Sequence, residues 1–305
     1  MVKSLVIGGL GFIGSHIADL LLEKGHQVII IDNESTGSIK NLNKNTIFKN
    51  ADIANFESIS PFFKDVDYVF HTAALPRIKP SFDDPVSFLK VNVQGTINCL
   101  LAAKANKASK FIFSSSSSVY GNNFALPTDE NNGFDPLSPY ALQKLESEMY
   151  CKLFSKVYNM SIVILRYFNV YGPRSFNEKD TFSAYSSPVG IFIKQKKSGM
   201  PLTITWDGEQ KRDYINVNDV ARANYAAAIT KLENKFEIFN IGSGENHPVN
   251  EIANIVGGPK TFIPKREGEA RITLAEISKA KKLLNWIPEV KFKEGIQEMM
   301  NLEGL

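Results

Sequence analysis

The stretch SLVIGGLGFIGSH, residues 4–16, constrains the fold of this chain more than any other feature. An apolar run of strand length breaks into glycines, and the sequence then becomes amphipathic, as in a helix. Gly8, Gly11 and Gly14 form a G-x-x-G-x-x-G pattern at this junction. Glycine lowers helix stability by roughly 1 kcal/mol relative to alanine, so the cluster needs a reason. A dinucleotide supplies one, because its pyrophosphate requires a tight turn, a bare backbone and a free helix N-terminus. An ordinary strand-to-helix turn is the alternative.

An acidic residue follows the glycines at the spacing that a dinucleotide site requires. Asp32 lies 18 residues after Gly14 and ends QVIIID, the second predicted buried strand. A carboxylate there can bind a ribose diol, and it would repel a 2′-phosphate. Asp32 therefore favours NAD over NADP as the cofactor. The alternative is that Asp32 is an ordinary aspartate in the turn after a strand.

Strand-like and helix-like segments alternate through the first half of the chain. The strand-like runs lack polar alternation, which is typical of a parallel sheet covered on both faces. These runs are VKSLVIG, QVIIID, YVFHTAA, KFIFSSS and SIVILRYFN. Helix patterns separate them, over 13–25, near 84–106 and over 137–158. We predict an α/β fold, a Rossmann-type doubly wound parallel sheet with a smaller C-terminal α/β lobe that binds the substrate.

The second half of the sequence changes character. Residues 174–188 carry no periodicity and indicate a loop that could order on a ligand, and the later segments are short and mixed. The expected domains are a NAD-binding domain over 1–168 and a substrate-binding lobe over 169–305. A segment over about 212–242 is expected to rejoin the first domain.

Composition argues against several other classes of protein. The 305 residues, 43% of them hydrophobic, suit one large α/β unit or two joined lobes. A formal net charge of +3 is too small for a nucleic-acid surface, and no apolar stretch approaches the roughly 20 residues of a membrane span. Two cysteines and the lack of a signal-peptide layout indicate a cytoplasmic protein. The four histidines show no metal-like spacing, so no metal is expected.

A second group of residues combines a serine-rich strand end with a Tyr-x-x-x-Lys pair. FIFSSSSSVYG ends a predicted strand in five serines, residues 114–118, and SPYALQKLESEM places Tyr140 and Lys144 on one side of a predicted helix. A tyrosine with a pKa near 10 is a poor base at neutral pH, but a nearby ammonium and a positively charged nicotinamide favour the phenolate. A serine hydroxyl could hold a substrate oxygen against the tyrosine. The pair alone occurs by chance on helical surfaces, whereas its combination with the glycines and Asp32 is specific.

Here the chain resembles a known family almost from end to end. It is similar to the extended short-chain dehydrogenase/reductases, and within them to the NAD-dependent nucleotide-sugar epimerases and dehydratases, above all the UDP-glucose and UDP-N-acetylglucosamine 4-epimerases. The segments that carry the resemblance are GGLGFIGSH, ADIAN, HTAA, VNVQGT, SSSSSVYG, SPYALQK, LRYFNVYGPR, GEQKRDYINVNDV and REGEARITLAEISKAKKLLNW.

The resemblance implies site residues, position by position. It makes Tyr140 the catalytic base, Lys144 its electrostatic partner and Ser116 the hydroxyl that aligns the sugar. Residues implied to contact NAD are Gly8, Gly11, Phe12, Ile13, Gly14, Asp32, Asn33, Asp52, Ile53, Thr72, Ala73, Ala74, Asn92, Ser114, Tyr140, Lys144 and Tyr167. Residues implied to contact the UDP-sugar are Ser116, Tyr140, Asn169, Val189, Arg212, Tyr214, Arg266, Glu269 and Thr273.

The roles of two positions are open to other interpretations. Arginine forks suit a diphosphate, but Arg212 could instead form a surface ion pair with Asp213. Pro76 occupies a place where some relatives carry lysine, which puts that cofactor contact in doubt.

The serine-rich strand end separates the reactions of the family. Dehydratases and sugar-acid decarboxylases carry a Glu, often preceded by Asp, where this chain has Ser117 and Ser118. The resemblance therefore favours simple epimerisation at C4 of a UDP-sugar through a 4-keto intermediate. A UDP-glucuronate 4-epimerase, another NAD-dependent sugar-nucleotide enzyme and a catalytically silent dinucleotide sensor are the alternatives.

Two further expectations concern sugar size and assembly. Thr273 falls where epimerases confined to glucose and galactose tend to carry tyrosine, so the resemblance implies room for an N-acetyl group; the alternative is a loop residue displaced by one or two positions. Residues 84–105 and 138–158 are apolar on more than one face, and relatives pair such helices, so a homodimer is expected.

Overall fold

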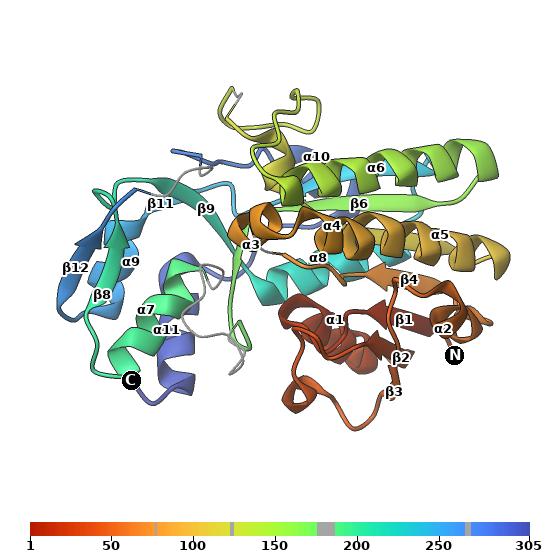
Figure 1. The fold of residues 1–305 in the computed structure, drawn as a ribbon, viewed down its shortest axis with the longest axis horizontal. Helices are drawn as coiled ribbons and strands as arrows, with labels where there is room; N and C mark the ends of the chain where they lie inside the picture. Colours follow the sequence, from red (N-terminus) through yellow and green to blue (C-terminus); the bar gives the residue numbers. More distant parts are fainter. Residues whose placement is uncertain (77, 123–124, 176–186, 266–269) are drawn as a thin grey trace.

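The computed structural model describes residues 1–76, 78–122, 125–175, 187–265 and 270–305. Seven strands form one sheet in the order β10-β6-β5-β4-β1-β2-β3, and every neighbouring pair is parallel (Figure 1). The strands are β1 (Lys3–Ile7), β2 (Gln27–Asp32), β3 (Ile47–Asn50), β4 (Tyr68–His71), β5 (Lys110–Ser116), β6 (Ile162–Tyr167) and β10 (Phe236–Ile241). The order reverses between β1 and β4, which confirms the predicted doubly wound Rossmann-type fold.

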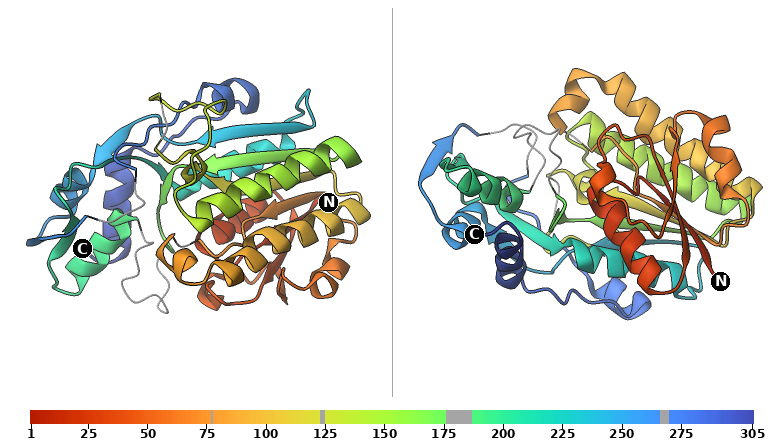
Figure 2. Two further views of the ribbon diagram at one scale, coloured as in Figure 1. Left: turned by 45° about the horizontal axis from the view of Figure 1, so that its top comes forward. Right: turned by 90° about the horizontal axis from the view of Figure 1, so that it is seen from below.

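Helices cover both faces of this sheet (Figure 2). Successive side chains of a strand point to opposite faces, so Val6 packs into one core, whereas Leu5 and Ile7 pack into the other. All three are fully buried, which explains why the strands lack polar alternation. The first core is closed by α1 (Phe12–Glu23), α8 (Val217–Ile229) and α10 (Ser278–Leu284), and the second by α2 (Phe56–Ile59), α5 (Gly95–Ala105) and α6 (Pro139–Tyr158).

The helix expected near residues 84–106 is divided in the structure. A π-helical turn, Lys90–Gln94, separates α4 (Pro85–Leu89) from α5. The Asn92 carbonyl within this turn accepts a hydrogen bond from Thr96 Oγ1 at 2.6 Å. Such turns hold one extra residue and are frequent at functional sites. Two short elements, β3 at the sheet edge and α3 (Ile78–Asp83), also had no clear pattern in the sequence.

In its described residues, the second lobe contains two small sheets and three helices, which lie to the left of the large sheet in Figure 1. Its core contains fully buried side chains such as Ile193, Ile204 and Ile252. One sheet consists of β7 (Asn169–Tyr171), β9 (Lys211–Asn216) and β11 (Asn246–Pro248), and the other of β8 (Leu202–Thr205) and β12 (Lys260–Ile263). The helices are α7 (Pro188–Lys197), α9 (Val249–Val256) and α11 (Phe292–Leu302).

The chain passes between the two lobes several times. β9 lies in the second lobe, but α8 directly after it packs on α1, and β10 forms the edge of the large sheet. Residues of α10 also lie in the first core, before α11 returns to the second lobe. We therefore propose the two domains with these crossings, the segment that rejoins the first domain beginning with α8. Within the described ranges, no helix combines the length and the apolar character needed to cross a membrane.

Candidate active site

The turn between β1 and α1 has no room for side chains at two of its glycines. A Cβ at Gly14 would lie 2.2 Å from the carbonyl oxygen of Gly8, and a Cβ at Gly8 would lie 2.6 Å from the Ala73 nitrogen. Gly8 also has a φ of +82°, which favours glycine. Gly11 is the N-cap residue of α1 and has no side chain that could bind the first backbone amides of the helix. These amides therefore remain available to an anion. This bare cradle fits the pyrophosphate of a dinucleotide.

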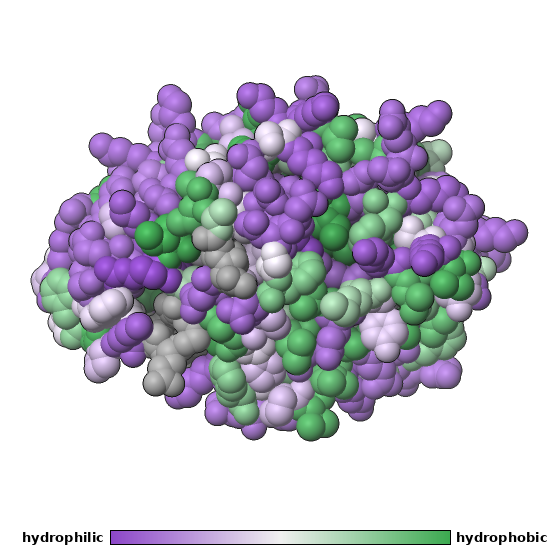
Figure 3. Space-filling view, turned by 90° about the horizontal axis from the view of Figure 1, so that it is seen from above, coloured by the Kyte–Doolittle hydropathy of each residue, from purple (hydrophilic) through white to green (hydrophobic). Residues whose placement is uncertain are grey.

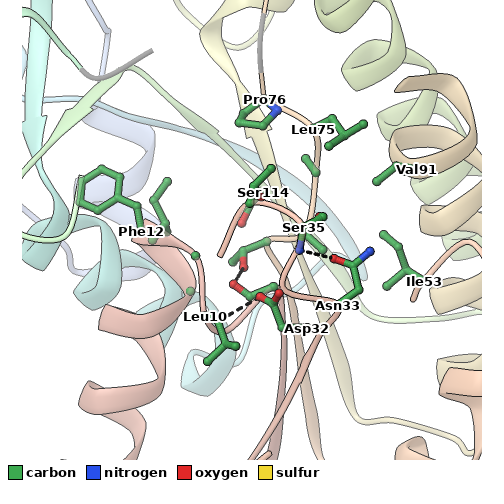
Figure 4. A pocket seen from close by; sticks show the side chains of 18 of the residues that line it. Leu10, Phe12, Asp32, Asn33, Ser35, Ile53, Leu75, Pro76, Val91 and Ser114 are labelled. Carbon is green, nitrogen blue, oxygen red and sulfur yellow. Dashed lines mark hydrogen bonds between the residues drawn. The ribbon is translucent and has the colours of Figure 1, made fainter. Parts of the chain in front are cut away.

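Asp32 lies beside this turn at the end of β2, in the cleft shown in Figure 4. Its Oδ2 accepts a hydrogen bond from the Leu10 amide at 3.0 Å, and its Oδ1 accepts one from the Glu34 amide at 2.8 Å. Burial raises the pKa of the carboxyl, and these two hydrogen bonds oppose that rise. A carboxylate has about four acceptor sites, so Asp32 keeps capacity to bind a ribose diol.

The predicted catalytic residues meet where β5 ends and α6 begins. Lys144 is buried, and its Nζ donates to the Ser114 carbonyl oxygen at 2.7 Å. Ser114 Oγ shares a hydrogen bond with the Tyr167 hydroxyl at 2.9 Å. Ser116 forms a side-chain hydrogen bond with Tyr140. Tyr140 lines the dinucleotide cleft and also a second cleft between the two lobes.

Burial dominates the electrostatics of Tyr140 and Lys144. Desolvation raises the pKa of Tyr140 to about 12, and the hydrogen bond from Ser116 only partly offsets this rise. Desolvation also lowers the pKa of Lys144 to about 8. Tyr140 is therefore neutral at pH 7 in the protein alone. The preference for the phenolate that Lys144 and a bound nicotinamide would provide together stays a prediction, because it concerns the protein with NAD in place.

The second cleft contains most of the predicted substrate residues. Thr273 Oγ1 accepts hydrogen bonds from Asn169 Nδ2 at 3.3 Å and from the Asp213 amide at 3.2 Å. Arg212 lines the same cleft, where its Nη1 donates to the carbonyl oxygens of Lys211 and Arg271, both at 3.1 Å. The lining of this cleft thus includes a guanidinium and two polar side chains, groups that suit recognition of a phosphate.

Asp213, the alternative partner of Arg212, points into the protein. It is fully buried, and its carboxylate accepts hydrogen bonds from the amides of Ser243, Gly244 and Ala275 at 2.6, 3.1 and 3.0 Å. Ser243 Oγ donates to the same carboxylate at 2.8 Å. Asp213 therefore binds three segments of the second lobe together beneath the cleft, which does not favour the surface ion pair.

The two clefts bring together most, but not all, of the predicted residues. The dinucleotide cleft is lined by every predicted NAD residue except Asp52 and Asn92, and the second cleft by Ser116, Tyr140, Asn169, Arg212, Tyr214 and Thr273. Asp52 instead accepts hydrogen bonds from Asn33 Nδ2 and the Ala54 amide. Val189 is fully buried in the core of the second lobe, so Pro188 and Ile191 line the cleft in its place. Arg266, Glu269 and most of the predicted loop over 174–188 lie outside the described residues.

Asn92 supports the cleft from behind. Its Oδ1 accepts from the Leu75 amide at 2.8 Å, and its Nδ2 donates to the Leu75 carbonyl at 3.2 Å and to Gln143 Oε1 at 3.0 Å. The side-chain amide thus forms three hydrogen bonds within the protein. It holds Leu75, which lines the dinucleotide cleft.

Several residues of the clefts had no signal in the sequence. Arg174 lines the dinucleotide cleft, and its Nη1 pairs with Asp19 Oδ2 of α1 at 2.7 Å. The glycine turn is also held by the segment after β2, where Asn41 Nδ2 donates to the Leu10 carbonyl at 2.9 Å. Residues missed in the second cleft include Phe168, Ile191, Thr203, Thr205 and Gln210. They come from short segments of the second lobe and from turns, which lack periodicity.

Comparison with known proteins identifies the family. Residues 4–242 match the sequence profile of the NAD dependent epimerase/dehydratase family. The chain belongs to this family. Members use NAD, which agrees with the glycine cradle and with the position of Asp32. In the part of the chain that the structure describes, no group of three or more His, Cys, Asp or Glu side chains could hold a metal ion.

Relatives in this epimerase/dehydratase family cover the whole chain. A protein of Methanocaldococcus jannaschii described as a putative UDP-glucose 4-epimerase is 41% identical, over 97% of each chain. A UDP-glucose 4-epimerase from Thermotoga maritima, solved with UDP-glucose, is 36% identical with a TM-score of 0.91 and covers 98% of each chain. A UDP-N-acetylglucosamine 4-epimerase from Methanobrevibacter ruminantium is 35% identical with a TM-score of 0.91 and covers 100% of this chain and 99% of its own.

The position of Asp32 predicts the cofactor preference. Asp32→Ala is expected to lower the affinity for NAD by about 10- to 100-fold, because hydrogen bonds to a charged acceptor contribute about 1.5–3 kcal/mol. The variant also loses support for the glycine turn, which lowers the affinity for both NAD and NADP. Because it no longer repels the 2′-phosphate, the affinity for NADP falls less, and the preference for NAD becomes smaller. Isothermal titration calorimetry with NAD and NADP measures this ratio. Asp52→Asn, which removes a nearby carboxylate outside the cleft lining, is the control, and equal affinities of the unmodified protein for both cofactors would contradict the prediction.

Proposed function

We propose that this protein is a UDP-sugar 4-epimerase with NAD as a tightly bound cofactor. The observation that carries the proposal is the position of Tyr140, which lines both the dinucleotide cleft and the cleft between the lobes. An acid/base group at such a junction can act on a substrate in one cleft while a cofactor occupies the other. The relatives of known name, which act on UDP-glucose or UDP-N-acetylglucosamine, support the same reaction.

Each catalytic residue has a distinct task in this reaction. Bound NAD supplies the hydride acceptor and donor for C4 of the sugar and a positive charge near the site. Tyr140 removes the proton of the C4 hydroxyl and later returns it, and Ser116 holds that oxygen against the tyrosine. Lys144 contributes its ammonium charge from beneath, which favours the phenolate form of Tyr140. The protein returns to its starting state after each cycle, since the reaction has no net redox change.

The second cleft is proposed to hold the nucleotide part of the substrate. Arg212 and Asn169 both line this cleft and can bind the diphosphate, together with Arg266, which lies outside the described residues. The turn Ser117–Tyr120 after β5 begins with Ser117 and Ser118. A serine hydroxyl cannot exchange a proton at neutral pH as a glutamate can, so the site favours epimerisation over elimination.

A panel of UDP-sugars tests the proposed function. Purified protein is incubated with UDP-glucose, UDP-N-acetylglucosamine and UDP-glucuronate, and the C4 epimers are resolved by chromatography. We expect conversion of the first two. Conversion of UDP-glucuronate alone would favour the uronate enzyme, and NAD binding without any conversion would favour a dinucleotide sensor. We propose the cytoplasm as the compartment, which suits the buried free thiols of Cys99 and Cys151.

Tyr140→Phe tests the assignment of the base. The variant keeps the ring and loses the hydroxyl, so the fold and the NAD content should persist while kcat falls by about 10²- to 10⁴-fold, the usual contribution of a general acid/base group. Initial rates with UDP-glucose, together with NAD released on denaturation, measure both quantities. Retention of most of the activity would show that another group is the base.

The size of residue 273 is expected to control the size of the sugar. Thr273 lines the second cleft, and its hydroxyl is bound to Asn169 and Asp213. Thr273→Tyr should fill the space of an N-acetyl group and lower kcat/KM for UDP-N-acetylglucosamine by about 10- to 200-fold more than for UDP-glucose. Thr273→Val removes the hydroxyl at similar volume, so it should affect the two substrates equally. Equal losses in Thr273→Tyr would exclude residue 273 as the gate.

An exposed apolar stripe on α6 supports the proposed homodimer. Leu142, Met149, Leu153 and Val157 are 46%, 57%, 51% and 59% exposed at helical spacing. Val86 of the adjacent α4 is 76% exposed. Viewed from above, hydrophobic side chains gather in the lower right of the molecular surface among polar ones (Figure 3). Apolar patches of this kind mark interaction surfaces, and a second copy of the chain would cover this one.

Leu153→Glu is expected to disrupt this dimer. A charge in the middle of a buried apolar interface is costly, so the variant should behave as a monomer of 34.0 kDa where the unmodified protein has twice that mass. Light scattering at micromolar concentration measures the mass. Leu302→Glu, at a similarly exposed position of α11, is the control and should remain dimeric. An unmodified protein of 34.0 kDa alone would contradict the prediction.

A further inference from the structure

The proposed mechanism leaves unused a buried ion pair directly behind the catalytic residues. Glu148 lies one turn after Lys144 on α6, so Tyr140, Lys144 and Glu148 share one side of the helix. Glu148 is 4% exposed, and Arg166 of β6 is fully buried. Two hydrogen bonds join them, from Arg166 Nη2 to Glu148 Oε2 at 2.6 Å and from Nε to Oε1 at 2.9 Å. A bidentate pair of this kind fixes both groups in orientation.

The same carboxylate holds the end of β5. Ser115 Oγ donates to Glu148 Oε1 at 2.5 Å. The carbonyl oxygen of Ser114 accepts a hydrogen bond from Lys144, and the side chain of Ser116 forms one with Tyr140. Three successive residues of β5 are thus bound to three residues on one side of α6. A shift of the helix along the strand would break all three contacts together.

Glu148 also provides the opposite charge near Lys144. The groups that interact with Lys144 from the elements around it are His71 of β4, the Phe113 ring of β5, and Glu148 and Cys151 of α6. Arg166 of β6 pairs with Glu148. Burial lowers the pKa of His71 to about 3 and raises the pKa of the Cys151 thiol, so both are neutral at pH 7. Burial lowers the pKa of Lys144 to about 8, and the negative charge of Glu148 opposes this effect.

We propose that Glu148 is a positioning residue for the epimerisation, which fixes the catalytic side of α6 against β5 together with Arg166 and supplies the negative charge opposite the Lys144 ammonium. The Lys144 ammonium loses its proton as the pH rises through the pKa of Lys144. Without the negative charge of Glu148, this loss occurs at lower pH. The kinetic part of this inference rests on the proposed function, whereas the effect on Lys144 does not.

The first experiment measures the Lys144 ammonium directly by NMR of protein labelled with [ε-13C]lysine. The signal of Lys144 is identified by its loss in Lys144→Met. Glu148→Gln is expected to lower the pKa of Lys144 by about 1–3 pH units, the range that a neighbouring opposite charge accounts for. Glu148→Asp keeps the charge and should restore most of the pKa. An unchanged pKa of Lys144 in Glu148→Gln overturns the proposal.

A second variant protects the test against failure to fold. Glu148→Gln leaves the buried Arg166 guanidinium without its carboxylate, which destabilises proteins strongly. Glu148→Gln/Arg166→Met removes both charges, and the expected fall in the pKa of Lys144 is smaller but has the same direction, because Glu148 lies nearer to Lys144 along the helix. An unchanged pKa in the double variant overturns the proposal as well.

The second experiment separates positioning from stability. The pH dependence of kcat with UDP-glucose is measured per mole of folded, NAD-bound protein. In Glu148→Gln the alkaline limb is expected to move to lower pH, and kcat falls by up to about 100-fold with little change in KM, as for misplaced catalytic groups. An unchanged profile and kcat with only a lower melting temperature would make Glu148 merely structural and overturn the proposal.

The matched control and the failure of the proposed function have distinct signatures. The matched control is Glu237→Gln, because Glu237 of β10 also pairs with a basic side chain, that of Lys279, at 2.8 Å. This variant should change neither the pKa of Lys144 nor the pH dependence of kcat. If the unmodified protein converts no UDP-sugar, the proposed function fails, and the NMR titration still decides whether Glu148 sets the charge of Lys144.

Discussion

The rest of the structure depends on how closely α1 approaches the end of β1. The Gly8 carbonyl lies where a side chain of residue 14 would begin, and Ala73 lies where one of residue 8 would begin. Because neither residue has a side chain, the helix starts directly at the edge of the sheet. The carboxyl ends of β1, β2, β4 and β5 then surround one cleft, as is general for ligand sites in doubly wound sheets. Asp32 at the end of β2 and Lys144 behind β5 both line the cleft at this edge of the sheet.

The end of β6 contributes to the junction of the two clefts, beside Tyr140 and Pro76. β6 ends at Tyr167, which lines both clefts, and β7 begins two residues later at Asn169 in the second lobe. Tyr167 is hydrogen-bonded to Ser114 and Asn224, so its ring is fixed by the first lobe. The second cleft therefore begins directly at a buried, hydrogen-bonded part of the large sheet.

Sequence reasoning succeeded where the chemistry is local. The glycine turn, Asp32, the serines of β5 and the Tyr140–Lys144 pair each lie within one turn, strand end or helix, so spacing alone defines them. It failed where a position depends on distant contacts. Asn92 is held inward by a π-helical turn and by Leu75, and Val189 is covered by the core of the second lobe.

The passage of the chain between the lobes has a consequence for how the protein is made. The edge strand beside β6 is β10, and the first core is completed only by α8 and α10. In a nascent chain that has emerged only as far as residue 235, β6 is therefore an outer strand of the sheet. Its backbone groups, which pair with β10 in the finished protein, are then open to pairing with other chains. The catalytic elements β5 and α6 are synthesised early, but they can settle into a finished domain only late in translation. Neither lobe can therefore be cut out of the sequence as a continuous fragment.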